Sequence, residues 1–114
     1  MFFLLAAAKR YLDENYSRAI TLDSLAEIAH VNKYYLSHSF KREYGASPID
    51  YLMKRRITEA KALLTSTDFS LTQIAEQIGF GSLAYFSKCF RKIEGTRPNE
   101  YRKSAKQKPA QGSR

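Results

Sequence analysis

An internal repeat of about fifty residues constrains the fold of this chain more than any other feature. Residues 22–51 read LDSLAEIAHVNKYYLSHSFKREYGASPIDY, and residues 71–101 read LTQIAEQIGFGSLAYFSKCFRKIEGTRPNEY. The front halves match at a separation of 49 and the back halves at a separation of 50, so the second copy has one extra residue near Gly81 and Ser82. The positions that recur fifty residues later are Leu36, Ser37, Phe40, Gly45, Pro48 and Tyr51, at Phe86, Ser87, Phe90, Gly95, Pro98 and Tyr101. A repeat of this length indicates that one small structural unit occurs twice.

Each copy has the pattern of a short helix, a tight turn and a second helix, followed by a glycine stop and a proline restart. Thr21 and Asn32 are helix N-cap residues by type, and Ser70 with Gln73 predicts a capping box. Leu36 and Phe40 lie four residues apart and share one helix face, as do Phe86 and Phe90. The pattern is that of a helix-turn-helix unit in both copies.

The remaining helices complete an all-α fold of seven helices, with two helix-turn-helix subdomains joined by a long linker helix. The first helix is predicted from about Phe2 to Asn15, with Leu25, Ile28 and Ala29 as the inward face of the second. The long helix begins at Ser47–Pro48 and runs to about Thr65. We therefore divide the chain into four parts: 1–46, the first unit with its N-terminal helix; 47–67, the linker helix; 68–103, the second unit; and 104–114, a basic flexible tail.

Composition narrows the class of partner. The 114 residues carry a formal net charge of +8, which favours a polyanion such as a nucleic acid. Cys89 is the single cysteine, so no disulfide can form within the chain, and with only His30 and His38 present no spaced zinc-ligand set exists. The opening apolar run ends at Lys9, far too short to span a bilayer. We expect a cytoplasmic protein with no metal, no cofactor and no membrane partner.

The arrangement resembles the DNA-binding domain of the AraC/XylS family of bacterial transcription regulators. The second copy carries most of the resemblance, and the match covers roughly residues 4–103. The residues that carry it are Ile74-Ala75, Ile78-Gly79-Phe80, Tyr85-Phe86-Ser87, Phe90, Gly95, Pro98 and Tyr101-Arg102. The resemblance implies a sequence-specific DNA-binding regulator of the activator type that touches RNA polymerase.

The outward faces of the third and sixth helices are the candidate DNA-reading surfaces. An α-helix fits the major groove, where each base pair presents a distinct pattern of donors and acceptors. The predicted base-reading residues are Tyr34, Ser37, His38, Ala84, Ser87 and Lys88. The predicted phosphate contacts are Lys33, Lys41, Arg91 and Lys92. The family often has arginine where this chain has His38 and Lys88, which leaves the preferred base at both positions open.

Several alternatives remain open at this stage. A non-specific nucleic-acid binder would use charge alone, and a helical protein-interaction module would use apolar surface such as Phe2 and Phe3. An enzyme has the least support, because the sequence offers no nucleophile with a base, no paired catalytic carboxylates and no glycine-rich phosphate loop. Family members often carry a separate effector domain before this point, which leaves open whether one is missing from this chain.

Overall fold

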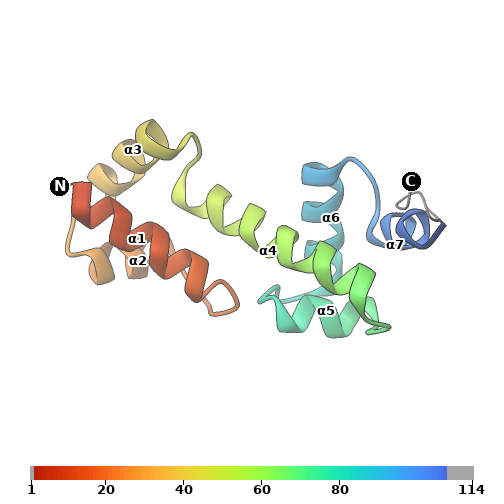
Figure 1. Cartoon of the computed structure of the whole chain (residues 1–114). Helices are drawn as coiled ribbons and strands as arrows, with labels where there is room; N and C mark the ends of the chain where they lie inside the picture. Colours follow the sequence, from red (N-terminus) through yellow and green to blue (C-terminus); the bar gives the residue numbers. More distant parts are fainter. Residues whose placement is uncertain (1, 108–114) are drawn as a thin grey trace. The chain divides into compact units, whose positions relative to one another are not determined.

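The computed structural model describes the backbone of residues 2–107 and the side chains of residues 3–105. These residues form seven α-helices, as predicted from the sequence (Figure 1). The helices are α1 (Phe2–Glu14), α2 (Leu22–Ala29), α3 (Lys33–Tyr44), α4 (Pro48–Ser66), α5 (Leu71–Gln77), α6 (Leu83–Glu94) and α7 (Pro98–Gln107). The chain divides into two compact units, Met1–Arg56 and Ile57–Arg114, called unit 1 and unit 2 below. The boundary lies inside α4, so each unit includes part of that helix.

Unit 1 is built around apolar side chains from its three short helices and the first half of α4. Helix α1 packs against both α2 and α3. The fully or almost fully buried residues of this core are Leu5, Ala8, Leu12, Leu25, Ala26, Ala29, Leu36, Phe40 and Leu52. The Phe40 ring is in edge contact with the Tyr51 ring, with 5.7 Å between centroids, which joins α3 to α4. This core fixes α3, the second helix of the helix-turn-helix, with one face inward.

Unit 2 repeats this construction with larger aromatic side chains. Helix α6 packs against α5 on one side and α7 on the other. The buried apolar residues are Ile57, Ala60, Leu64, Ile74, Ala75, Ile78, Phe80, Phe86 and Phe90. The Phe90 ring contacts the Tyr101 ring at 5.6 Å and 70°, the counterpart of the Phe40–Tyr51 contact. The aromatic residues predicted as core are therefore structural, which leaves the opposite face of α6 for other partners.

Backbone hydrogen bonds confirm the repeat and locate its extra residue. Val31 donates to the Ala26 carbonyl, and Phe80 donates to the Ala75 carbonyl, a separation of 49. Gly45 and Gly95 both cap their helices at φ 82° and ψ −1°, and each donates to the residue four positions earlier at 2.8 Å, a separation of 50. The N-caps Asn32 and Ser82 are also 50 residues apart, so the inserted residue is Gly81, between Phe80 and Ser82. His30 adopts φ 58° at the turn of unit 1, where Gly79 has φ 98° in unit 2.

Two arginines donate to backbone carbonyls far away in the sequence, Arg56 to carbonyls in the loop after α1 and Arg102 to carbonyls at the end of α4. Arg56 is 5% exposed, and it donates to the carbonyls of Tyr16 at 2.6 Å and Arg18 at 2.8 Å. Arg102 donates to the carbonyls of Leu64 and Thr67 at the end of α4. A helix leaves its last carbonyls without intrahelical donors, and a guanidinium can supply several. The sequence analysis did not identify this role for either arginine.

The structure corrects two details of the sequence-based prediction. Ile28 is 44% exposed instead of facing inward, and Ala26 takes the buried position on α2. Helix α7 continues to Gln107, so residues 104–107 are helical and do not belong to a flexible tail; residues 108–114 lie outside the described part. Phe3, which the interaction-module alternative names as apolar surface, is 82% exposed.

Candidate nucleic-acid interface

In unit 1 the predicted reading residues lie on the face of α3 that the core leaves outside. Asn32 caps this helix by accepting from the backbone amides of Tyr34 and Tyr35 at 2.8 and 3.2 Å. Tyr34 is 67% exposed, His38 and Lys41 are exposed, and Ser37 is half-buried. Burial of Leu36 and Phe40 fixes the rotation of the helix, so this polar face is held outward.

In unit 2 the corresponding face of α6 is held in the same way. Ser82 caps the helix by accepting from the Tyr85 amide at 3.1 Å, while Phe86 and Phe90 are fully buried. Ala84 and Lys88 are exposed and Ser87 is half-buried. The predicted residues of each copy therefore share one outward helix face, Tyr34, Ser37 and His38 in unit 1 and Ala84, Ser87 and Lys88 in unit 2.

The N-terminal turn of α6 also exposes two apolar side chains that the sequence analysis did not assign to reading. Leu83 is 40% exposed and Tyr85 is 48% exposed, although the Tyr85 ring contacts the Phe80 ring edge-on at 5.3 Å. The N-terminal residues of a recognition helix contact base edges in helix-turn-helix proteins. An apolar side chain placed there is suited to a thymine methyl group.

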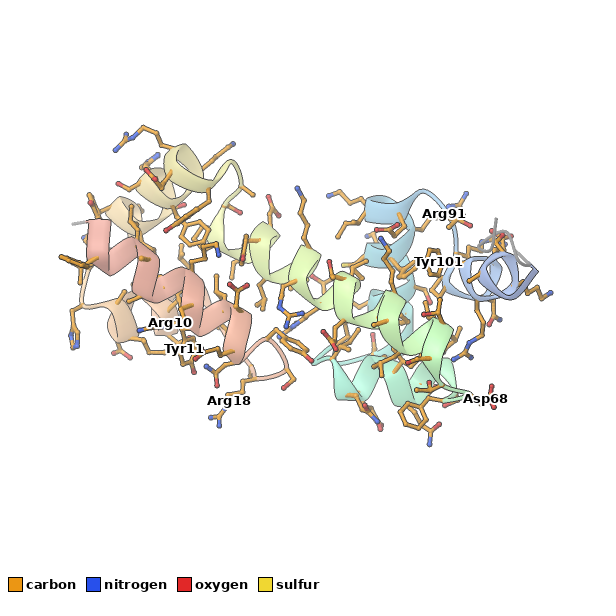
Figure 2. The ribbon with its side chains drawn as sticks, in the orientation of Figure 1. Arg10, Tyr11, Arg18, Asp68, Arg91 and Tyr101 are labelled. Atoms are coloured by element: carbon orange, nitrogen blue, oxygen red, sulfur yellow. The ribbon has the colours of Figure 1, made fainter. Side chains whose placement is uncertain are left out.

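The four predicted phosphate-contact residues differ in their surroundings. Lys41, Arg91 and Lys92 are exposed in the last turns of α3 and α6. Figure 2 shows Arg91 near the end of α6 from which the chain turns to α7. Lys33 differs because its ammonium lies 3.1 Å from the Asp23 carboxylate, and this hydrogen bond raises the pKa of Lys33. Lys33 would have to share its charge between Asp23 and a phosphate.

An open groove of 660 Å³ runs along the cationic side of α6 in unit 2. Its walls come from the start of α5, the outer face of α6 and the start of α7. The lining residues are Leu71, Ser87, Lys88, Arg91, Lys92, Arg97, Pro98 and Asn99. The groove thus brings together four predicted site residues with Arg97 and Asn99, which the sequence analysis missed. The sequence pattern gave little indication of these two residues, because they lie at the start of α7 and the predicted reading face belongs to α6.

Among residues 2–107, no three His, Cys, Asp or Glu side chains gather closely enough to hold a metal ion. None of the helices in this range is sufficiently long and apolar to cross a bilayer. The interface described above rests on hydrogen-bond donors and fixed positive charge.

Comparison with known proteins gives the chain its family. A family profile described as "Helix-turn-helix domain" matches residues 25–104. The HTH-type transcriptional regulator YdiP of Escherichia coli is 38% identical over 96 residues, 84% of this chain and 32% of that protein. The bifunctional transcriptional activator/DNA repair enzyme AdaA of Bacillus subtilis is 32% identical over 96 residues, 84% of this chain and 46% of that protein.

Solved structures of DNA-binding domains have the same fold as this chain. The DNA-binding domain of the global transcriptional factor AdpA, solved in complex with a target DNA, has a TM-score of 0.88 at 25% identity and covers 94% of this chain and 96% of that one. The chain spans about a third of the length of the first curated relatives that it matches. Together with the two helix-turn-helix units and their outward polar faces, these matches show that the chain belongs to the AraC-type helix-turn-helix family of DNA-binding transcription regulators.

Proposed function

We propose that the chain regulates transcription by inserting α3 and α6 into two neighbouring major-groove segments of its target DNA. The supporting observation is that two equivalent helices expose equivalent polar faces, while their opposite faces are fixed by buried Leu36, Phe40, Phe86 and Phe90. A purely charge-driven binder would need cations but no duplicated, rotationally fixed face.

The proposed contacts divide by chemistry. Hydrogen-bonding and apolar side chains near the middle and start of each helix read bases, and cations toward the helix ends bind phosphates. The base-reading residues are Tyr34, Ser37, His38, Ala84, Ser87 and Lys88, and the phosphate contacts are Lys33, Lys41, Arg91 and Lys92. Lys88 can donate to guanine O6 or N7, while the exposed Tyr34 ring and the Ala84 methyl group suit a thymine methyl.

The role in a complete regulator is proposed by analogy with the family. AdaA is described as a transcriptional activator, and we propose activation through contact with RNA polymerase for this chain as well. An effector domain outside this chain would supply any signal, and the protein would act in the cytoplasm. Neither catalysis nor a cofactor is needed for DNA reading by the two helices, and we propose that this chain has neither.

Selection of bound sequences from random duplex DNA at moderate salt tests the proposal. We expect two enriched blocks about one helical turn, or roughly 10 base pairs, apart, because each reading helix occupies one major-groove segment. A single block would reduce the proposal to one reading helix. Binding that yields no enrichment and disappears as salt rises would contradict sequence-specific recognition by this chain and support binding by charge alone.

A further inference from the structure

The residue at the start of α7 departs from a rule that helices α2 to α6 follow. The N-cap of a helix favours a short polar side chain that accepts from the first-turn amides. The residues in this position elsewhere are Thr21, Asn32, Ser47, Ser70 and Ser82, each of which accepts such a hydrogen bond. At α7 the position belongs to Arg97, whose carbonyl accepts from the Tyr101 amide and whose side chain has no acceptor atom to offer the first turn.

The repeat shows that this exception belongs to unit 2. The equivalent of Arg97 in unit 1 is Ser47, which accepts from the Asp50 amide at 3.1 Å and is committed to capping α4. Glu100 compensates from the other direction, because its carboxylate accepts from the Arg97 amide at 3.5 Å and from the Thr96 hydroxyl at 3.1 Å. These hydrogen bonds, with the backbone of Arg97 foremost, lower the pKa of Glu100. Departures from local preference are expected where a residue serves binding.

The Arg97 side chain is one of four cations lining the open groove. Lys88, Arg91 and Lys92 come from α6, while Arg97 comes from the start of α7, so positive charge reaches the groove from two elements. All four side chains are exposed. Elsewhere in the described residues, Lys9, Lys33, Arg55 and Lys61 are engaged in ion pairs with carboxylates. The Glu100 carboxylate accepts from the Arg97 backbone amide and from the Thr96 hydroxyl, and the positive charges of Arg97 and Arg91 help to lower its pKa.

We propose that this groove seats the sugar-phosphate backbone of the bound DNA and that Arg97 is a phosphate contact. The proposal rests on the DNA-binding function proposed above. A polyanion is attracted to an open groove lined by cations from two helices, and a guanidinium matches two phosphate oxygens at once. Lys88 lies toward the base-reading part of the α6 face, whereas Arg91, Lys92 and Arg97 belong to the phosphate-binding end. Unit 2 would then contribute more to salt-dependent affinity than unit 1, where Ser47 replaces the arginine.

The test measures DNA affinity against salt for the whole chain and three variants. Arg97→Gln removes the charge and Arg97→Lys keeps it. Arg10→Gln removes an equal charge from exposed Arg10 on α1, a residue of unit 1 that does not line the groove. Each phosphate contact contributes about 0.9 to the slope of log K against log salt. Arg97→Gln should therefore lower the slope magnitude by about 0.9 and weaken binding about eightfold at 0.1 M salt. Arg97→Lys should restore the slope, and Arg10→Gln should leave it unchanged.

Sequence preference gives the second readout. Arg97→Gln should weaken every duplex by the same factor and leave the selected blocks unchanged, because phosphates carry no base identity. A slope that matches that of Arg10→Gln would overturn the proposal, and so would loss of preference at one base pair, which would make Arg97 a reading residue. Because phosphate binding needs no sequence preference, the slope can be measured on random DNA even if the selection yields no blocks. Failure of the groove assignment and failure of sequence-specific reading are thus distinguishable.

Discussion

At the scale of single residues, the structure explains why some side chains of α3 and α6 are available for the proposed reading of DNA while their neighbours are buried. Along α6, Phe86 and Phe90 are fully buried and Lys88 between them is exposed. The rotation of the helix is therefore set by two aromatic side chains, and the position of Lys88 follows from them. His38 has the equivalent position in unit 1, where Leu36 and Phe40 set the rotation.

We expect Lys88→Ala to lose discrimination at one base pair of the unit 2 block, by about 1–3 kcal/mol, because a lysine donates to guanine in the major groove. The measurement compares the affinities of the selected duplex and of its single-base variants. Lys103→Ala, which removes an equally exposed lysine from α7, should leave discrimination intact. An equal loss on every duplex would instead identify Lys88 as a phosphate contact.

A second residue-scale feature is a half-buried polar cluster between α1 and α4. The Tyr51 hydroxyl donates to Asp13 Oδ1 at 2.6 Å, and Lys9 Nζ donates to Asp13 Oδ2 at 3.2 Å. Burial, followed by the hydrogen bond to Asp13, raises the pKa of Tyr51 above its ordinary value of 10.0. The hydrogen bond to Asp13 likewise raises the pKa of Lys9 above 10.5.

Because both pKa values are raised in the folded protein, both groups affect the stability of the fold in the same direction. A group whose pKa is higher in the folded state stabilises the fold below its unfolded pKa, and this contribution is lost as the pH rises through the folded pKa. We expect Tyr51→Phe to lower the free energy of unfolding by about 1 kcal/mol at pH 7, with a difference that shrinks above pH 10. Urea unfolding from pH 7 to 11 measures it. Tyr101→Phe, at the same position of unit 2, provides the control, and an identical pH profile for both variants would contradict the role of Asp13.

At the scale of elements, each helix-turn-helix unit depends on a sharp stop after its reading helix. Gly45 and Gly95 both have φ 82° and both donate to the preceding turn. A side chain added at either position would meet nothing within 4 Å, so the cost of substitution lies in the backbone conformation and not in a clash. Left-handed backbone is unfavourable for residues with a Cβ.

We expect Gly95→Ala to lower the free energy of unfolding by about 1 kcal/mol, because the left-handed backbone conformation at this position is unfavourable for alanine. Gly81→Ala is the matched control, since a Cβ there also meets nothing within 4 Å and the backbone lacks the positive φ. The control should be neutral, or stabilising by a few tenths of a kcal/mol through the unfolded chain. Urea unfolding of both variants measures the two changes in stability. Equal destabilisation would show that the left-handed conformation of Gly95 is not the reason for the loss.

At the scale of the whole molecule, the chain consists of two versions of one unit that share α4 across their boundary. The versions differ where they would meet DNA. Unit 1 offers Tyr34 and His38, and unit 2 offers Ala84 and Lys88, so the two predicted half-sites should differ in sequence. A single chain with two different reading helices has no need of a symmetric operator.

Much of this organisation could be predicted from the sequence because it depends on local interactions. The helix caps at Thr21, Asn32 and Ser70, the stops at Gly45 and Gly95 and the inserted Gly81 all involve residues within a few positions of one another. Apolar spacing identified the buried face of α6 for the same reason, because one helical period determines which side chains share a face.

The tertiary structure decided which partners meet across long stretches of sequence. Apolar periodicity placed Ile28 in the core, yet the packing of α2 against α1 and α3 buries Ala26 instead. Arg56 looks like a surface residue in the sequence, but it is buried because the carbonyls of Tyr16 and Arg18 accept its hydrogen bonds. Arg97 joins the cations of α6 only because α7 folds back beside that helix. By itself the sequence determined the two units and their reading faces, since short-range hydrogen bonds and helical period suffice for them. Only the fold decided the buried arginine and the cationic groove, since these depend on which distant elements pack together.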